Sequence, residues 1–89
     1  MPQLNEEQLK RAQRRAYRLG VRVFFSKRKH KKLDVFDKDG DYITSIGDVR
    51  YSDYLQHGDK ERRTRYKQRH EKNRHVEGSA GFYADKILW

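Results

Sequence analysis

Several side chains that can bind a metal ion or transfer a proton gather in the second half of the sequence: His57, Asp59, His70, Glu71, Asn73 and His75. A His-Asn-His-type endonuclease uses such residues, with a general-base His on a strand beside a metal-binding His on a helix. No histidine here falls in an expected strand, and His70 and His75, five residues apart, do not share a helix face. We therefore expect His57 and His70 to pack against Tyr54 and Tyr66. A small metal-dependent nuclease remains the second alternative function.

The segment 37–41, Asp-Lys-Asp-Gly-Asp, resembles part of a calcium-binding loop. It lacks the length of such a loop and its terminal bidentate glutamate. Asp39-Gly40 between two runs of β-forming residues instead favours a tight hairpin turn. We expect no metal site, no cofactor, no catalytic residue and no enzymatic activity.

Basic residues are the other candidates for function, and they form two blocks. Residues 1–33 hold eleven Lys and Arg against two acids, and residues 60–75 hold eight against two. Between them, residues 34–59 hold two bases against seven acids, although the whole chain has a net charge of +9. This pattern favours binding to a polyanion such as a phosphate backbone.

The candidate polyanion contacts are Arg11, Arg14, Arg15, Arg18, Lys27, Arg28, Lys29, Lys31, Lys32, Arg62, Arg63 and Arg69. A solvated surface is the alternative for the 27–32 run, because most charge runs have no partner. For the bases of 60–73, the alternative is a network of salt bridges to the acidic block 34–59. Both alternatives stay open at this point.

The elements that must position these residues follow from capping and periodicity. Asn5 and Gln8 predict a capping box for a helix over 6–19, and Gly20 predicts its end. Further elements are expected as a strand over 21–25, a hairpin over 33–46, a helical turn over 51–55 capped by Ser52, and helices over 60–73 and 82–88. The fold class is α+β, a small β-hairpin or three-stranded sheet with short helices and a basic N-terminal helix.

The core must be thin, because 34% of the residues are hydrophobic and 39% are charged. Aromatic rings are expected to form the structural core, namely Tyr51, Tyr54, Phe82 and Trp89, with a base-stacking platform as the alternative. The stripe Leu9, Ala12, Ala16 and Leu19 is shallow. We therefore divide the chain into a basic arm, 1–20, which projects and orders on a partner, and a small α+β domain, 21–89.

The chain has no cysteine, no apolar run long enough to span a membrane, and no apolar segment typical of a signal peptide. An intracellular or particle-packaged protein is expected, without membrane contact.

An ordered set of short motifs runs through the second half: Lys31-Lys32-x-Asp-Val-Phe, Asp39-Gly40, Ile46-Gly47, Tyr51-Ser52-Asp53-Tyr54, His57-x-Asp59, Arg62-Arg63, Tyr66, Arg69-His70, Ala80-Gly81-Phe82 and Leu88-Trp89. Over residues 26–89 this set resembles an uncharacterised family of short basic proteins encoded by giant DNA viruses and large tailed phages. Ile46-Gly47 departs from that family's aromatic-Gly pair, and the helix over 6–19 lies outside the resemblance. The resemblance implies a viral origin and carries over no catalytic residue.

The basic charge pattern favours binding to a polyanion, and the resemblance implies a virion setting; we therefore expect a virion-associated structural protein that cements capsid proteins or bridges capsid and packaged DNA. Its partners would be capsid or other virion proteins and DNA, and it would be ordered within a larger assembly in the virion or the host cell. The first alternative is a sequence-independent nucleic-acid-binding accessory protein.

Overall fold

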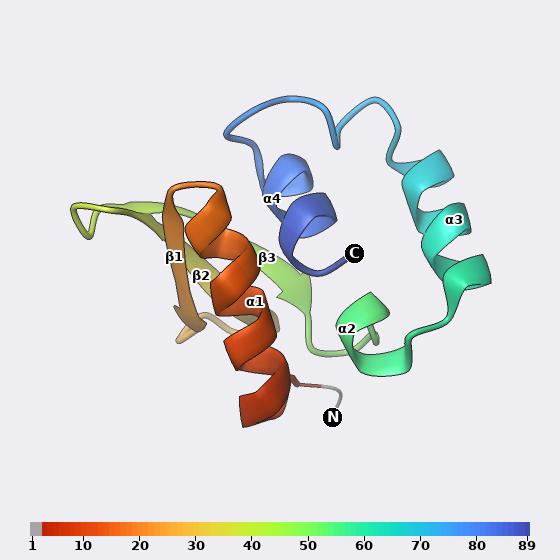
Figure 1. The fold of residues 1–89 in the computed structure, drawn as a ribbon, viewed down its shortest axis with the longest axis horizontal. Coiled ribbons are helices and arrows are strands. Elements are labelled where there is room, and N and C mark those ends of the chain that lie inside the picture. The colour runs from red at the N-terminus through yellow and green to blue at the C-terminus, as the bar shows by residue number, and fades with distance from the viewer. Residues whose placement is uncertain (1–2) are drawn as a thin grey trace.

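Three strands form an antiparallel sheet in the order β1-β2-β3 in the computed structural model, which describes residues 3–89 (Figure 1). The strands are β1 (Val21–Phe25), β2 (Lys31–Asp37) and β3 (Tyr42–Asp48). The Asp39-Gly40 turn joins β2 to β3, and Gly40 has a φ of 92°, a conformation that glycine adopts without strain. The predicted strand and hairpin are therefore confirmed.

Four helices complete the α+β fold: α1 (Glu6–Arg18), α2 (Tyr54–His57), α3 (Lys60–Arg69) and α4 (Ala80–Ile87). The capping box of Asn5 and Gln8 begins α1 as predicted, and Asp59 and Ser79 cap α3 and α4. Two expectations were wrong. Asp53, not Ser52, caps α2, and α3 ends at Arg69 instead of reaching residue 73.

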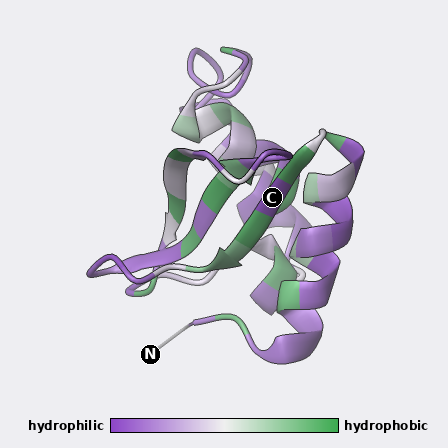
Figure 2. Ribbon diagram, turned by 90° about the vertical axis from the view of Figure 1, so that its left-hand side faces the viewer, coloured by the Kyte–Doolittle hydropathy of each residue, from purple (hydrophilic) through white to green (hydrophobic). Residues whose placement is uncertain are grey.

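The N-terminal helix lies on the sheet and does not project from it. Ala12 and Ala16 are fully buried in the same hydrophobic cluster as Val23 and Leu33. Figure 2 shows α1 running along one side of the sheet. The small alanine side chains, read from the sequence as a shallow stripe, allow the helix to approach the strands closely. The expectation of a projecting arm over 1–20 is thus corrected for the described residues from 3 onward.

A buried ion pair joins β2 to the start of α2. Lys32, only 1% exposed, donates through Nζ to Asp53 Oδ2 at 2.8 Å and to Gln56 Oε1 at 2.6 Å. The prediction that Lys32 contacts a polyanion is therefore wrong, because its ammonium is enclosed and already neutralised by a carboxylate of its own chain.

A glycine in β3 lets α4 reach this ion pair. Gly47 has a φ of 78°, and a Cβ atom there would lie 2.9 Å from Leu88 Cδ1 and 3.0 Å from Lys32 Cβ. Any larger residue would push Leu88 away from the strand. Gly47 thus holds the sheet, the ion pair and the end of the last helix together.

Replacing Gly47 should destabilise the fold more than replacing Gly40. Both positions have positive φ, so alanine at either should cost about 1 kcal/mol of backbone strain. Gly40→Ala meets no atom within 4 Å, whereas Gly47→Ala adds a clash that should cost about 1–3 kcal/mol more. Urea unfolding of the two variants measures the difference. Equal losses would show that Leu88 does not pack against Gly47.

Removing the buried ammonium of Lys32 should also lower the free energy of unfolding. Lys32→Ala leaves the Asp53 carboxylate buried without its cation, a loss of about 3–5 kcal/mol. Lys31→Ala, at the exposed neighbouring position, should change stability by less than about 0.5 kcal/mol. The double variant Lys32→Met, Asp53→Asn should recover part of the loss, because it removes both charges. If denaturation finds the two single alanine variants alike, the ion pair is not buried.

Candidate functional site

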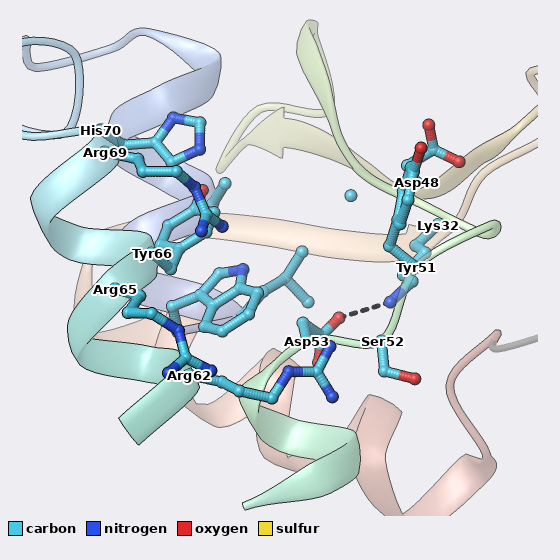
Figure 3. A pocket seen from close by; sticks show the side chains of 14 residues that line it. Lys32, Asp48, Tyr51, Ser52, Asp53, Arg62, Arg65, Tyr66, Arg69 and His70 are labelled. Carbon is cyan, nitrogen blue, oxygen red and sulfur yellow. Dashed lines mark hydrogen bonds and ion pairs between the residues drawn. The ribbon is translucent and has the colours of Figure 1, made fainter. Parts of the chain in front are cut away.

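A groove with a volume of about 540 Å³ lies between α3 and the chain that leaves β3. Three arginines of α3 line one wall, Tyr51 and Ser52 contribute to the other, and Leu88 and Trp89 add apolar surface. Figure 3 shows the arginine side chains extending from α3 toward the side where Tyr51 and Ser52 lie. The groove is therefore both basic and aromatic.

The arginine row consists of Arg62, Arg65 and Arg69, whose spacing of three and four residues places them on one helix face. Arg65 lies 3.5 Å from Glu61, an exposed pair that contributes little. Within residues 3–89, Arg62 and Arg69 form no ion pair with an acidic side chain. Arg65 was missed from the sequence, although its spacing from the two predicted arginines could have indicated it.

Acidic side chains of the opposite wall are already paired. Asp53 is neutralised by Lys32, and Asp48 forms a bidentate contact with Arg50 at 2.7 and 2.9 Å. The hydrogen bonds from Arg50 hold the pKa of Asp48 well below its ordinary value. Since these carboxylates have their own cations, the charge of the arginine row is not cancelled across the groove.

A stack of rings supports α3. Tyr66 lies parallel to Trp89, with 4.1 Å between centroids and 4° between planes, and His70 covers the other side of Tyr66 at 4.2 Å. Burial raises the pKa of Tyr66 to about 12, so its hydroxyl stays protonated. The prediction that His70 packs against Tyr66 is confirmed.

His57 extends this stack from α2. Its ring lies 5.3 Å from Trp89 and 6.1 Å from Tyr54, as predicted for a packing residue. Nδ1 accepts a hydrogen bond from the Asp59 N–H at 2.8 Å. Burial lowers the pKa of His57, with a further contribution from Arg62, so the ring is neutral at physiological pH.

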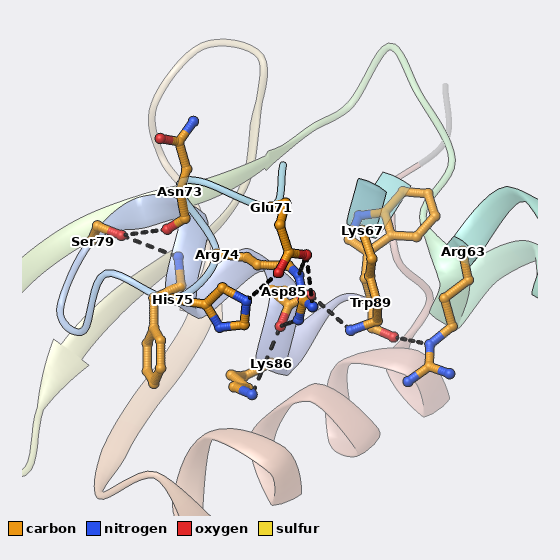
Figure 4. Close-up of polar contacts among 11 residues, drawn as sticks. Arg63, Lys67, Glu71, Asn73, Arg74, His75, Ser79, Asp85, Lys86 and Trp89 are labelled. Atoms are coloured by element: carbon orange, nitrogen blue, oxygen red, sulfur yellow. Dashed lines mark hydrogen bonds and ion pairs between the residues drawn. The ribbon is translucent and has the colours of Figure 1, made fainter. Parts of the chain in front are cut away.

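Three other bases of the 60–75 block, Arg63, Lys67 and Arg74, contact residues near the C-terminal end of the described chain (Figure 4). Buried Asp85 accepts from Lys67 at 2.7 Å and lies 3.6 Å from Arg74. Arg63 donates to the main-chain oxygen of Trp89 at 2.7 Å. Among the described residues, no ion pair joins α3 to a carboxylate of 34–59, so the expected alternative of salt bridges to that block is wrong.

The other predicted polyanion contacts lie outside the groove. Arg11, Arg14, Arg18, Lys27, Arg28, Lys29 and Lys31 are exposed on α1 or in and after the β1–β2 turn. Arg15 is half-buried and donates to the main-chain oxygen of Ile87, while Arg28 lies over the ring of Tyr42 and 3.5 Å from Asp34. Of the twelve predicted contacts, three line the groove: Arg62, Arg69 and the buried Lys32.

One predicted core residue was placed wrongly. Tyr51 is 68% exposed, because it follows a tight turn in which its N–H donates to the carbonyl of Asp48. Tyr54, Phe82 and Trp89 are half-buried at the edge of the core. The fully buried positions are mainly aliphatic, with Leu33, Val35, Ile46, Ile87 and Leu88 at the centre.

Metal-ligating side chains do not cluster within residues 3–89, where no three His, Asp or Glu could hold one ion together. His75 lies at the surface, paired with Glu71 at 2.8 Å. The helices of the described chain are too short and too polar to span a membrane.

Comparison with protein families matches residues 21–70, more than half of the chain. The match covers the three strands, α2 and α3, and therefore both Tyr51 and the arginine row. Searches of curated proteins and of solved structures returned no match. The chain belongs to the family of unknown function DUF5754.

Proposed function

We propose that this protein binds nucleic acid through phosphate contacts, without sequence preference. The observation that carries the proposal is the row of Arg62, Arg65 and Arg69 along one wall of a groove whose acidic side chains are already paired. Arginine suits this role because its planar guanidinium donates two parallel hydrogen bonds to a phosphate. Contacts to phosphate position the ligand and carry no sequence information.

The length of the row fits a short stretch of backbone. Arg62 and Arg69 are seven residues apart, which corresponds to about 10 Å along the helix axis. Nucleotides in one strand of B-form DNA rise by about 3.4 Å along the duplex axis, so a row lying parallel to that axis spans roughly three of them. Exposed lysine and arginine side chains of α1 and the β1–β2 turn would add weaker contacts outside the groove.

Affinity for DNA should fall steeply with salt, and the groove arginines should account for much of that slope. Replacing Arg62, Arg65 and Arg69 by Gln should weaken binding and reduce the logarithmic salt slope by about 2 to 3. Fluorescence anisotropy with two unrelated sequences, at low and physiological salt, measures both quantities and should find them alike for the two sequences.

The control replaces Lys10, Lys38 and Lys72 by Gln, which removes the same charge from exposed positions outside the groove. This variant should lose less affinity than the groove variant. A flat salt response, a strong preference for one sequence, or equal losses in the two triple variants would contradict the proposal.

We further propose a place for this binding within a virion, where the protein would bridge packaged DNA and capsid protein. The resemblance to short basic viral proteins supports this setting. A second support is an aromatic patch on the sheet, in which Phe24 and Tyr42 flank Phe36 at centroid distances of 5.9 and 6.0 Å. Phe24 is 54% exposed, and exposed aromatic clusters of this kind mark protein interfaces.

Purified particles should contain the protein, and Phe24→Ser should reduce its incorporation while leaving DNA affinity unchanged. Exposed Phe24 lies outside the groove, so its replacement should alter protein contact alone. Quantitative proteomics of particles made with each variant gives the result. Val76→Ser, at an exposed apolar position outside the patch, is the control. Absence from particles would exclude the virion setting.

A further inference from the structure

We infer that the groove prefers single-stranded nucleic acid, with one base stacked on Tyr51 while neighbouring phosphates lie against the arginine row. The inference rests on the proposed function and specifies its ligand. It is drawn from Tyr51, whose place on the wall opposite α3 gives an exposed ring a position beside three arginines.

Tyr51 is the groove ring that remains available for stacking. Tyr66 is covered by Trp89 on one side and His70 on the other, and Trp89 also contacts His57. Tyr51 has no ring contact with any other aromatic side chain of residues 3–89. A hydrophobic ring that is 68% exposed beside a basic wall is typical of a surface on which a base stacks.

Arg50 neutralises the acidic side chain beside Tyr51, so a ligand phosphate that approaches the Tyr51 ring is not repelled there. The adjacent carboxylate of Asp48 accepts hydrogen bonds from the Nε, Nη2 and main-chain N–H groups of Arg50 and stays paired. The ligand phosphates therefore meet arginines on one wall and a neutralised carboxylate on the other. Charge complementarity and an uncovered ring lie in the same groove, and a single strand offers both phosphates and free base faces.

A duplex does not satisfy the same groove. Its bases are paired and stacked on each other, so a base reaches Tyr51 only after unstacking, which costs a few kcal/mol. The groove, at about 540 Å³, has the size of a pocket that encloses a small molecule. A strand with unpaired bases can place a nucleotide in it without that cost, whereas a duplex contacts the arginine row and places no base in the groove.

The experiment compares oligothymidylate with a duplex of equal length, binding to the full chain at low salt. Trp89 is the sole tryptophan and lines the groove, so its fluorescence reports occupancy directly, alongside anisotropy of a labelled strand. The single strand should bind more tightly than the duplex and should change the Trp89 emission.

Tyr51→Leu should weaken single-strand binding about tenfold, the effect expected from losing one stacked base, and should leave duplex binding unchanged. Tyr51→Phe should keep the single-strand affinity, because it retains the ring. Tyr17→Leu is the matched control, since Tyr17 is also 68% exposed but lies outside the groove.

The two levels of the proposal fail differently. If Tyr51→Leu and Tyr17→Leu bind oligothymidylate alike, or if the duplex binds as tightly as the single strand, the stacking inference is overturned while phosphate binding stands. If the triple variant of Arg62, Arg65 and Arg69 binds both probes like the parent, the proposed function itself is overturned.

Discussion

The ammonium of Lys32 is the contact on which the geometry of the groove depends. It donates to Asp53 and Gln56, while the Cβ and Cδ atoms of the same side chain lie beside Gly47, where Leu88 closes over the strand. The Asp53 N–H donates in turn to the same Gln56 oxygen, so the start of α2 is held to Lys32 of β2 through the side chains of Asp53 and Gln56. The chain from Asp48 to Asp53 is therefore held at both ends. That segment carries Tyr51, and its fixed position sets where the ring stands relative to α3.

Local rules predicted the elements of this fold because each element follows from neighbouring residues. Asn5 with Gln8 began α1 and Asp39-Gly40 made the hairpin, as the sequence indicated. The burial of Lys32 could not be predicted in this way, since it depends on Asp53, twenty-one residues away, and on Leu88 from the last helix. In a run of six basic residues out of seven, nothing marks one lysine as buried, because period-two alternation along β2 places Lys32 on the face opposite Leu33 and Val35.

The candidate site was predicted only in part, because some of its residues follow from local sequence and others depend on tertiary packing. Arg62 and Arg69 were found because a helix over this segment was expected, and their spacing needed no tertiary information. Tyr51 was assigned to the core because the sequence has few aliphatic residues, which makes each ring a candidate for burial. The structure fills its core with aliphatic side chains and buried alanines instead, and this leaves Tyr51 free. Tyr51 follows the end of β3 at Asp48, after a turn closed by the hydrogen bond from its N–H to the carbonyl of Asp48, so the strand periodicity no longer directs its ring into the core.

The distribution of carboxylates explains how a chain with thirteen acidic residues can still present a basic groove. Three of the carboxylates are buried, those of Asp34, Asp53 and Asp85. Each contacts a cation or a hydroxyl of the same chain, so its negative charge is largely neutralised locally. The cations that they bind are mainly lysines, whereas Arg62 and Arg69 are left without acidic partners among the described residues. The helix that carries these arginines has no buried residue, so it is held against the domain chiefly by the stack of Tyr66 on Trp89 and by the contacts of Arg63 and Lys67. One face of α3 thus packs against the domain, and the adjacent face presents the arginines. In this way a helix that is polar on all sides keeps a fixed orientation while its arginines stay exposed.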